Sequence, residues 1–167
     1  MNRLLNKLIP RRQVNSIYDL ALDELWNEGI RGIITDLDNT LVGARVPLAT
    51  PELVKWLDYL QSLGFKVVIV SNNNETRVST FAKPLNVPYI HNARKPSVQS
   101  FSKAMEWMGL KPEQIAVLGD QMLTDVLGGN RMGLYTILVQ PISLVDEGFF
   151  TRINRRLEKA ARALMKK

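Results

Sequence analysis

Short apolar runs that end in polar residues alternate with amphipathic segments along most of this chain. An apolar run behind a turn signal is typical of a buried strand, and such runs lie at about 31–37, 66–70, 87–90, 115–118 and 135–139. Apolar residues at helical spacing predict helices between them, at about 16–28, 51–63, 75–83, 97–108 and 124–131. This alternation predicts an α/β fold with three layers, in which helices cover both faces of one parallel sheet.

Amphipathic segments also stand at the two ends of the chain. Residues 2–9 place four apolar side chains on one helical face, and Pro10 ends the pattern. Residues 149–167 predict a longer helix with Ile153 and Leu157 on one side and basic residues on the other. We therefore expect an N-terminal segment (1–15), a Rossmann-like domain (16–148) and a C-terminal helix (149–167).

Composition narrows the class of protein. A chain of 167 residues fits one domain with a substantial core, and its hydrophobic and charged fractions, 46% and 23%, are ordinary for globular proteins. Cysteine is absent and His91 is the single histidine, which excludes thiolate chemistry and sites that need two imidazoles. His91 has no acidic or nucleophilic motif beside it, so we expect a surface or packing role. No run is long enough for a membrane-spanning helix or a signal peptide, and a cytoplasmic location is expected.

The net charge of +6 is concentrated at the ends of the chain. Residues 1–12 and 151–167 together hold eleven basic residues and one acid, which leaves eleven basic and fifteen acidic residues in between. Basic, amphipathic ends on an acidic body favour contact with an anionic surface, either the inner face of a membrane or nucleic acid. The alternative for the C-terminal helix is ordinary packing of its apolar stripe on the domain.

Three predicted strands end in polar residues. Asp36 and Asp38 follow the first, Ser71 and Asn72 the second, and Asp120 the strand near 115–118. The carboxyl ends of parallel strands share one edge of a sheet, where ligands of open α/β folds bind. Two neighbouring carboxylates repel each other unless a cation or a shared proton relieves them, and Mg²⁺ suits carboxylates while leaving room for a phosphate.

This set of strand ends resembles the haloacid dehalogenase (HAD) superfamily of phosphotransferases. Asp36-Leu37-Asp38-Asn39-Thr40 matches its first motif, DxDx(T/V), and Ile69-Val70-Ser71-Asn72 matches its second. Lys95 matches the lone lysine of the third motif, and the segment from Gly119 to Asp125 matches the fourth, GDxxxxD. The four motifs occur in the family's order over residues 32–140.

The resemblance implies a role for each matching residue. Asp36 would be the nucleophile that forms an aspartyl-phosphate, and Asp38 the general acid and then the general base. Ser71, Asn72 and Lys95 would bind the phosphate, and Lys95 would also neutralise developing charge.

The resemblance also implies a Mg²⁺ site. Asp36, Asp120 and the backbone carbonyl of Asp38 would hold the ion. Thr40 and Asp125 would contact these groups without binding the ion themselves, and Asp125 would orient Lys95 or a metal-bound water.

Motif spacing bears on the substrate. Asp36 and Ser71 are 35 residues apart, and Ser71 and Lys95 are 24 residues apart. Secondary structure fills both intervals, so no cap domain is expected, and capless members of the superfamily resemble enzymes with open sites for large or surface-bound phosphates. The Asp-Asn-Thr-Leu and Gly-Asp-Gln stretches resemble the bacterial YqeG-type branch, which is similar to phosphatidylglycerophosphate phosphatases.

These observations predict a Mg²⁺-dependent phosphatase, with phosphatidylglycerophosphate as the expected substrate. Two alternatives stay open: a capless phosphatase acting on protein or nucleic-acid phosphate, and a binding or scaffold protein without turnover. The implied catalytic residues all precede residue 149, so removing the C-terminal helix is expected to leave turnover of a small soluble phosphate nearly unchanged.

Overall fold

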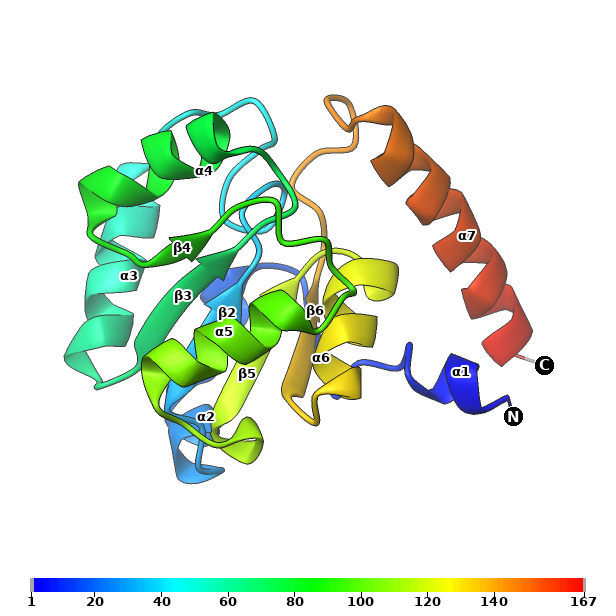
Figure 1. The fold of residues 1–167 in the computed structure, drawn as a ribbon, viewed down its shortest axis with the longest axis horizontal. Coiled ribbons are helices and arrows are strands. Elements are labelled where there is room, and N and C mark those ends of the chain that lie inside the picture. The colour runs from blue at the N-terminus through cyan, green and yellow to red at the C-terminus, as the bar shows by residue number, and fades with distance from the viewer. Residues whose placement is uncertain (1, 167) are drawn as a thin grey trace.

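The chain is built on a six-stranded sheet in the order β1-β6-β5-β2-β3-β4, with every neighbouring pair parallel (Figure 1). The structure is a computed structural model that describes residues 2–166. The strands are β1 (Arg12–Val14), β2 (Gly32–Thr35), β3 (Lys66–Val70), β4 (Tyr89–Ile90), β5 (Ile115–Gly119) and β6 (Tyr135–Val139). The predicted strands near 31–37, 66–70, 87–90, 115–118 and 135–139 are therefore confirmed.

Edge strand β1 was not predicted from the sequence. Its three residues, Arg-Gln-Val, contain no apolar run, and only pairing with β6 makes them a strand. Arg12 lies opposite Ile137, and Val14 lies opposite Val139. The polar segment before residue 16 thus completes one edge of the sheet.

Helices cover both faces of the sheet, as predicted. One face packs against α2 (Leu22–Asn27), α3 (Pro51–Ser62) and α4 (Glu75–Ala82), and the other against α5 (Gln99–Met108) and α6 (Leu127–Arg131). The two-residue period of a strand sorts the core between them. In β2, for example, Ile33 belongs to the first cluster and Ile34 to the second.

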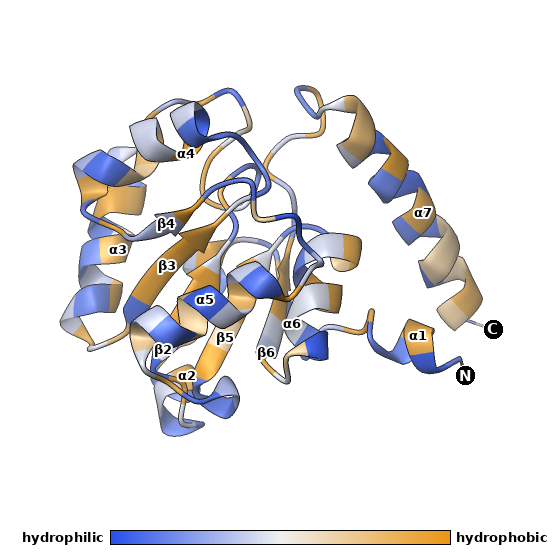
Figure 2. Ribbon diagram, viewed as in Figure 1, coloured by the Kyte–Doolittle hydropathy of each residue, from blue (hydrophilic) through white to orange (hydrophobic). Residues whose placement is uncertain are grey.

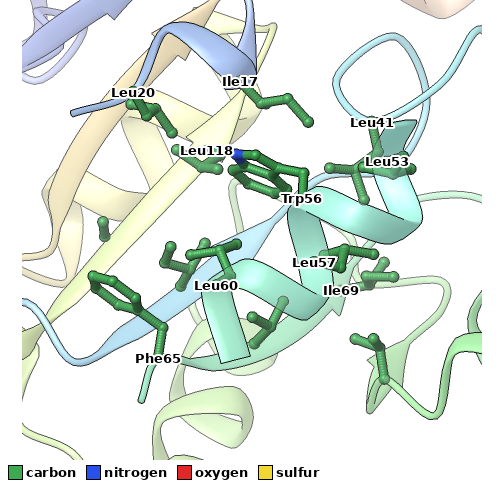
Figure 3. Packing of buried hydrophobic residues seen from close by; sticks show 14 of the residues in the cluster. Ile17, Leu20, Leu41, Leu53, Trp56, Leu57, Leu60, Phe65, Ile69 and Leu118 are labelled. Atoms are coloured by element: carbon green, nitrogen blue, oxygen red, sulfur yellow. The ribbon is translucent and has the colours of Figure 1, made fainter. Parts of the chain in front are cut away.

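Helix α3 shows how local sequence sets an element in place. The Thr50 side chain accepts a hydrogen bond from Leu53 N at 3.1 Å, and Pro51 occupies the first turn, where its missing N–H costs nothing. The buried stripe of the helix then packs on the sheet against Ile69 and Leu118 (Figure 3).

Two predicted helices are broken in the structure. Residues 16–28 form a 3₁₀ turn at Ile17–Asp19 and then α2, because Leu20 is extended and turns its buried side chain into the core. Residues 122–131 begin with a π-turn at Met122–Val126 before α6. The N-terminal helix, α1, is also shorter than expected and spans Arg3–Asn6.

The two ends of the chain meet beside α6. Helix α7 (Phe149–Met165) runs along the outside of the molecule, and α1 lies next to its last turn (Figure 1). Leu5 of α1 packs in the same small cluster as Ala161 and Met165 of α7. Among residues 2–166, no helix combines the length and apolar character needed to cross a bilayer.

Candidate active site

The site lies where the order of the sheet reverses. The chain passes from central strand β2 to β3 and β4 on one side, and then returns to β5 and β6 on the other. The connection after β2 leads toward β3, and the connection after β5 leads toward β6 on the other side. Because they diverge, a crevice opens at the carboxyl ends of β2 and β5. A pocket of about 250 Å³ lies there. Its lining comes from the residues after β2, β3 and β5, from the loop after β4 and from the C-terminal helix: Asp36, Asp38, Ser71, Asn72, Asn73, Lys95, Gln121, Thr124 and Thr151.

Lys95 sits at the bottom of this pocket between two carboxylates. Its Nζ lies 3.0 Å from Asp36 Oδ1 and 2.7 Å from Asp125 Oδ1, and its side chain is 3% exposed. Burial alone would lower the pKa of the Lys95 ammonium, but the charges of Asp125 and Asp36 raise it above its ordinary value. Lys95 therefore stays charged and donates to a carboxylate oxygen of Asp36.

The first motif forms a tight loop directly after β2. Asp36 N donates to Leu118 O at 2.9 Å, which extends the pairing with β5 by one residue. Asn39 adopts a left-handed conformation, with φ of 62°, and its N–H donates to Val42 O at 2.7 Å. Asparagine tolerates this conformation better than most residues. The turn holds Asp36 and Asp38 at the same pocket.

Asp120 is buried beside Asp36. Burial and the charges of Asp36 and Asp125 raise the pKa of Asp120 well above its usual range, and the charge of Arg155 opposes this. Thr40 Oγ1 donates to Asp120 Oδ1 at 3.1 Å, so the first motif holds the fourth in place. The position of Thr40 fits the supporting role that the resemblance implied.

The second motif contributes one buried hydroxyl and one bridging amide. Ser71 is buried in the pocket, and its Oγ accepts from Asn73 N at 3.1 Å. The side chain of Asn72 is bonded to the backbone of Lys95: it accepts from Lys95 N at 2.7 Å and donates to Lys95 O at 3.2 Å. Asn72 thus lines the pocket and also fixes the loop that carries the lysine.

Two residues that sequence reasoning missed hold Asp38. Asn73 Nδ2 donates to Asp38 Oδ2 at 2.8 Å, and Arg77 donates to Asp38 Oδ1 through Nε and Nη2 at 3.1 and 2.9 Å. Arg77 stands in the first turn of α4, which is capped by Asn74. The available signal in the sequence was that Arg77 lies in the helix directly after the polar end of β3. An arginine on a helix, however, usually faces solvent.

Asp125 depends on the glycine of the same motif. The π-turn places the Asp125 carboxylate directly over Gly119, where a Cβ would lie 2.1 Å from its Cγ. Asp125 Oδ2 accepts from Gln121 N at 3.2 Å, and Oδ1 faces Lys95. Glycine is therefore needed at position 119 because the Asp125 side chain occupies the space of a Cβ, and not because of an unusual backbone conformation.

Gly119→Ala is expected to displace Asp125 and, through it, Lys95. We expect activity to fall by roughly 100-fold, because small misplacements of catalytic groups have effects of this size. Phosphate release and thermal unfolding would measure the effect. Gly148→Ala is the matched control, since an added Cβ meets nothing within 4 Å there. Normal activity of Gly119→Ala would contradict the packing argument.

Arg155 of α7 reaches the same edge of the sheet from the C-terminal helix. Its Nη1 donates to the backbone oxygen of Asp120 at 2.6 Å, and its Nη2 donates to the Asp120 carboxylate. Its Nε donates to Glu147 at 2.9 Å, and Glu158 lies 3.8 Å from Nη1. The expectation that removing α7 leaves turnover of a small soluble phosphate nearly unchanged stays a prediction, and this contact argues against it, because a truncated chain would leave Asp120 without this partner.

The donor set fits a hard divalent cation. Carboxylate oxygens of Asp36, Asp120 and Asp125 lie within 4.8 Å of one another, and all three residues are buried. All three carboxylates already accept hydrogen bonds, Asp36 and Asp125 from Lys95 and Asp120 from Thr40 and Arg155, so an ion would share the Asp36–Asp120 pair with these donors. Oxygen ligands of this kind are those that Mg²⁺ takes in proteins. His91 does not line the pocket.

Comparison with known proteins gives consistent results at the levels of sequence and structure. Residues 2–143 match the family described as mitochondrial PGP phosphatase. A Bacillus subtilis protein described as probable phosphatase YqeG is 48% identical over 159 residues, which cover 95% of this chain and 92% of that protein.

More distant matches extend the likeness. The chloroplastic/mitochondrial phosphatidylglycerophosphate phosphatase 1 of Arabidopsis thaliana is 23% identical over 92% of this chain, which spans only 47% of that protein. A Legionella pneumophila structure described as a HAD superfamily (subfamily III A) hydrolase superposes with a TM-score of 0.55 at 17% identity, covering 80% of this chain and 70% of that one. The likeness to the Legionella pneumophila structure concerns the fold alone.

Proposed function

Because this chain belongs to the mitochondrial PGP phosphatase family and has the HAD fold, we propose that it hydrolyses phosphatidylglycerophosphate through an aspartyl-phosphate on Asp36, with Mg²⁺ as cofactor. Membership of the family makes the chain a phosphatase, a hydrolase of phosphoric monoesters. The observation that carries the mechanism is the position of Lys95 between Asp36 and Asp125, beside Asp120.

The first step transfers the phosphoryl group to the enzyme. A carboxylate oxygen of Asp36 attacks phosphorus, a new oxygen–phosphorus bond forms, and the ester bond to the leaving oxygen breaks. Asp38 gives its proton to that leaving oxygen. Lys95 Nζ, 3.0 Å from Asp36, stabilises the negative charge of the transferring group, and the Ser71 hydroxyl donates to one of its oxygens.

The second step returns the enzyme to its starting state. A water molecule attacks phosphorus and gives a proton to Asp38, the bond to Asp36 breaks, and inorganic phosphate leaves. Arg77 and Asn73 hold the Asp38 carboxylate in one position through three hydrogen bonds, so the same group can serve both proton transfers. These two residues therefore position the general base.

Asp36, Asp120 and the backbone carbonyl of Asp38 would hold Mg²⁺, with Thr40 and Asp125 supporting them. When bound, the ion supplies positive charge next to the phosphoryl oxygens. The burial of Asp36 and Asp120, with the raised pKa of Asp120, supports this assignment, because a cation would offset the repulsion between them.

The shape of the site supports a large substrate with an accessible phosphate. Among the described residues, 42–70 and 72–94 fold into α3, β3, α4 and β4 with their connections, and no cap domain covers the pocket. The pocket is polar and, at about 250 Å³, suits a phosphate headgroup better than a whole small metabolite. A lipid phosphate at the cytoplasmic face of a membrane, reached through the basic termini, meets these conditions.

Phosphate release from a panel of substrates tests the proposal. We expect hydrolysis of phosphatidylglycerophosphate in mixed micelles to exceed that of nucleotides, sugar phosphates and phosphopeptides, and to require Mg²⁺. Preference for a phosphopeptide or an oligonucleotide phosphate would replace the lipid assignment. Full activity in excess EDTA would overturn the metal assignment.

Asp120→Asn is expected to raise the Mg²⁺ concentration needed for half-maximal activity by roughly 10–100-fold, because one anionic ligand becomes neutral while the shape of the side chain is kept. A Mg²⁺ titration of activity would measure this shift. Asp58→Asn is the matched control, since Asp58 is exposed on α3, on the face that carries no site residue. An unchanged Mg²⁺ requirement would exclude Asp120 as a ligand.

A further inference from the structure

The outer side of α7 exposes large apolar residues. Phe149 and Phe150 are 72% and 81% exposed, and Leu157 and Leu164 are 54% and 60% exposed. With Ile153 these residues recur at helical spacing and form one stripe, which we call the outer stripe of α7. Figure 2 shows the resulting alternation of hydrophobic and hydrophilic segments along the helix. A continuous apolar patch of this kind marks an interaction surface.

Basic residues accompany the outer stripe along the whole helix. The exposed ones are Arg152, Arg156, Lys159, Arg162 and Lys166. Glu158 is the single acidic residue between 149 and 166, and it is buried on the inner side close to Arg155. The exposed charge of the helix is therefore entirely positive.

Helix α1 enlarges the same surface. It lies next to the last turn of α7, and its exposed residues include Arg3 and Leu4. One apolar cluster holds the N-terminal segment close to α7, and it contains Leu5, Leu8, Ala161 and Met165. The two ends of the sequence thus place basic and apolar residues next to each other.

The inner side of α7 connects this surface to the active site. Arg155 is bonded to Asp120, and Glu158 accepts from Leu123 N at 3.1 Å. Thr151, one residue after the exposed phenylalanine pair, lines the pocket that contains Asp36 and Lys95. A surface that contacts the start of α7 is therefore adjacent to the mouth of that pocket.

We infer that the outer stripe of α7, its basic residues and α1 form a docking surface for an anionic phospholipid bilayer. The apolar side chains enter the headgroup boundary, while the arginines and lysines contact lipid phosphates. Nucleic acid would satisfy the positive charge but would leave the exposed leucines and isoleucine in water. The inference rests on the proposed function, because it states how the pocket is brought to a phosphate at a membrane.

Sedimentation with vesicles tests the docking surface through binding alone, with no catalytic turnover in the measurement. We expect the wild type to bind vesicles of phosphatidylcholine mixed with phosphatidylglycerol, and to bind phosphatidylcholine alone much more weakly. Arg152→Glu/Arg156→Glu should weaken binding to the mixed vesicles by roughly 30-fold or more, since each basic residue near an anionic surface contributes about fivefold. Added salt should weaken the wild type in the same direction.

Two matched pairs of variants control for charge and for exposed apolar area. Lys55→Glu/Lys83→Glu makes the same charge change at exposed positions on α3 and after α4, and should bind like the wild type. Phe149→Ser/Phe150→Ser should lose vesicle binding, whereas Leu48→Ser/Trp107→Ser, at positions 54% and 48% exposed, should not. Turnover of soluble p-nitrophenyl phosphate should be unchanged in the α7 variants, while hydrolysis of vesicle-bound substrate falls.

Several outcomes would overturn the inference. One is equal vesicle binding by the α7 variants and the wild type, and another is equal binding of the wild type to neutral and anionic vesicles. Light scattering that finds a wild-type dimer and monomeric α7 variants would make this surface a contact between copies. Vesicle binding by a wild type that hydrolyses none of the substrates would reject the proposed function and leave the docking surface standing.

Discussion

Asp36→Asn is expected to lose phosphatase activity by about 10⁴-fold or more, the size of effect seen when a nucleophile is removed from a catalytic unit. The amide keeps the size of the side chain but lacks the negative charge needed to attack phosphorus. The fold should survive, because Lys95 keeps its 2.7 Å ion pair with Asp125. Phosphate release and a thermal melt of the same preparation would measure both properties.

Asp38→Asn separates the covalent mechanism from direct attack by water. This variant keeps the nucleophile and loses the proton carrier, so a substrate with a good leaving group should still phosphorylate it, and the phosphoenzyme should accumulate. Mass spectrometry should then find a phosphate on Asp36. Substantial activity in Asp36→Asn, or the absence of a phosphoenzyme in Asp38→Asn together with normal turnover, would reject the aspartyl-phosphate.

Arg155→Met is expected to destabilise the protein by about 3–5 kcal/mol, because it leaves buried carboxylates without their cation. Arg155 contacts the carboxylates of Asp120 and Glu147, whose side chains are 1% and 2% exposed. For a chain of this size the loss corresponds to a fall in melting temperature of roughly 10 °C. Differential scanning calorimetry would measure it, and activity should fall as Asp120 loses its orientation.

Arg156→Met is the matched control, since it makes the same substitution one position further along α7 at an exposed residue. We expect its melting temperature to stay close to that of the wild type. Adding Glu147→Gln to Arg155→Met should recover part of the lost stability, because one of the unpaired charges disappears. Equal melting temperatures for Arg155→Met and the wild type would mean that the ion pairs of Arg155 with Asp120 and Glu147 contribute nothing to the docking of α7.

The sequence predicted the parts of the site that follow from strand pattern. Asp36, Ser71 and Asp120 follow apolar runs, and parallel pairing of those runs brings them to one edge. Lys95 gave no such signal, and its assignment came from the family resemblance. The cluster of Asp36, Asp120 and Asp125 agrees with the expected carboxylate site, while the metal itself stays a prediction.

Arg77 and Arg155 were not predicted because their partners are remote in the sequence. Asp38 lies 39 residues before Arg77, and Asp120 lies 35 residues before Arg155. An arginine on an amphipathic helix looks like a solvent-facing residue until the helix is placed in space. The same limit applies to β1, which becomes a strand only through its contact with β6.

Arg155 also gives the enzyme a thermodynamic property. It joins α7 to Asp120, so the free energy of helix docking and the affinity of the proposed Asp36–Asp120 site for a cation would be linked quantities. Linkage is reciprocal: if a bilayer bound to α7 changes Mg²⁺ affinity by some factor, Mg²⁺ changes bilayer affinity by the same factor. Vesicle binding measured with and without Mg²⁺ would give this coupling factor directly, and Arg155→Met should bring it closer to one.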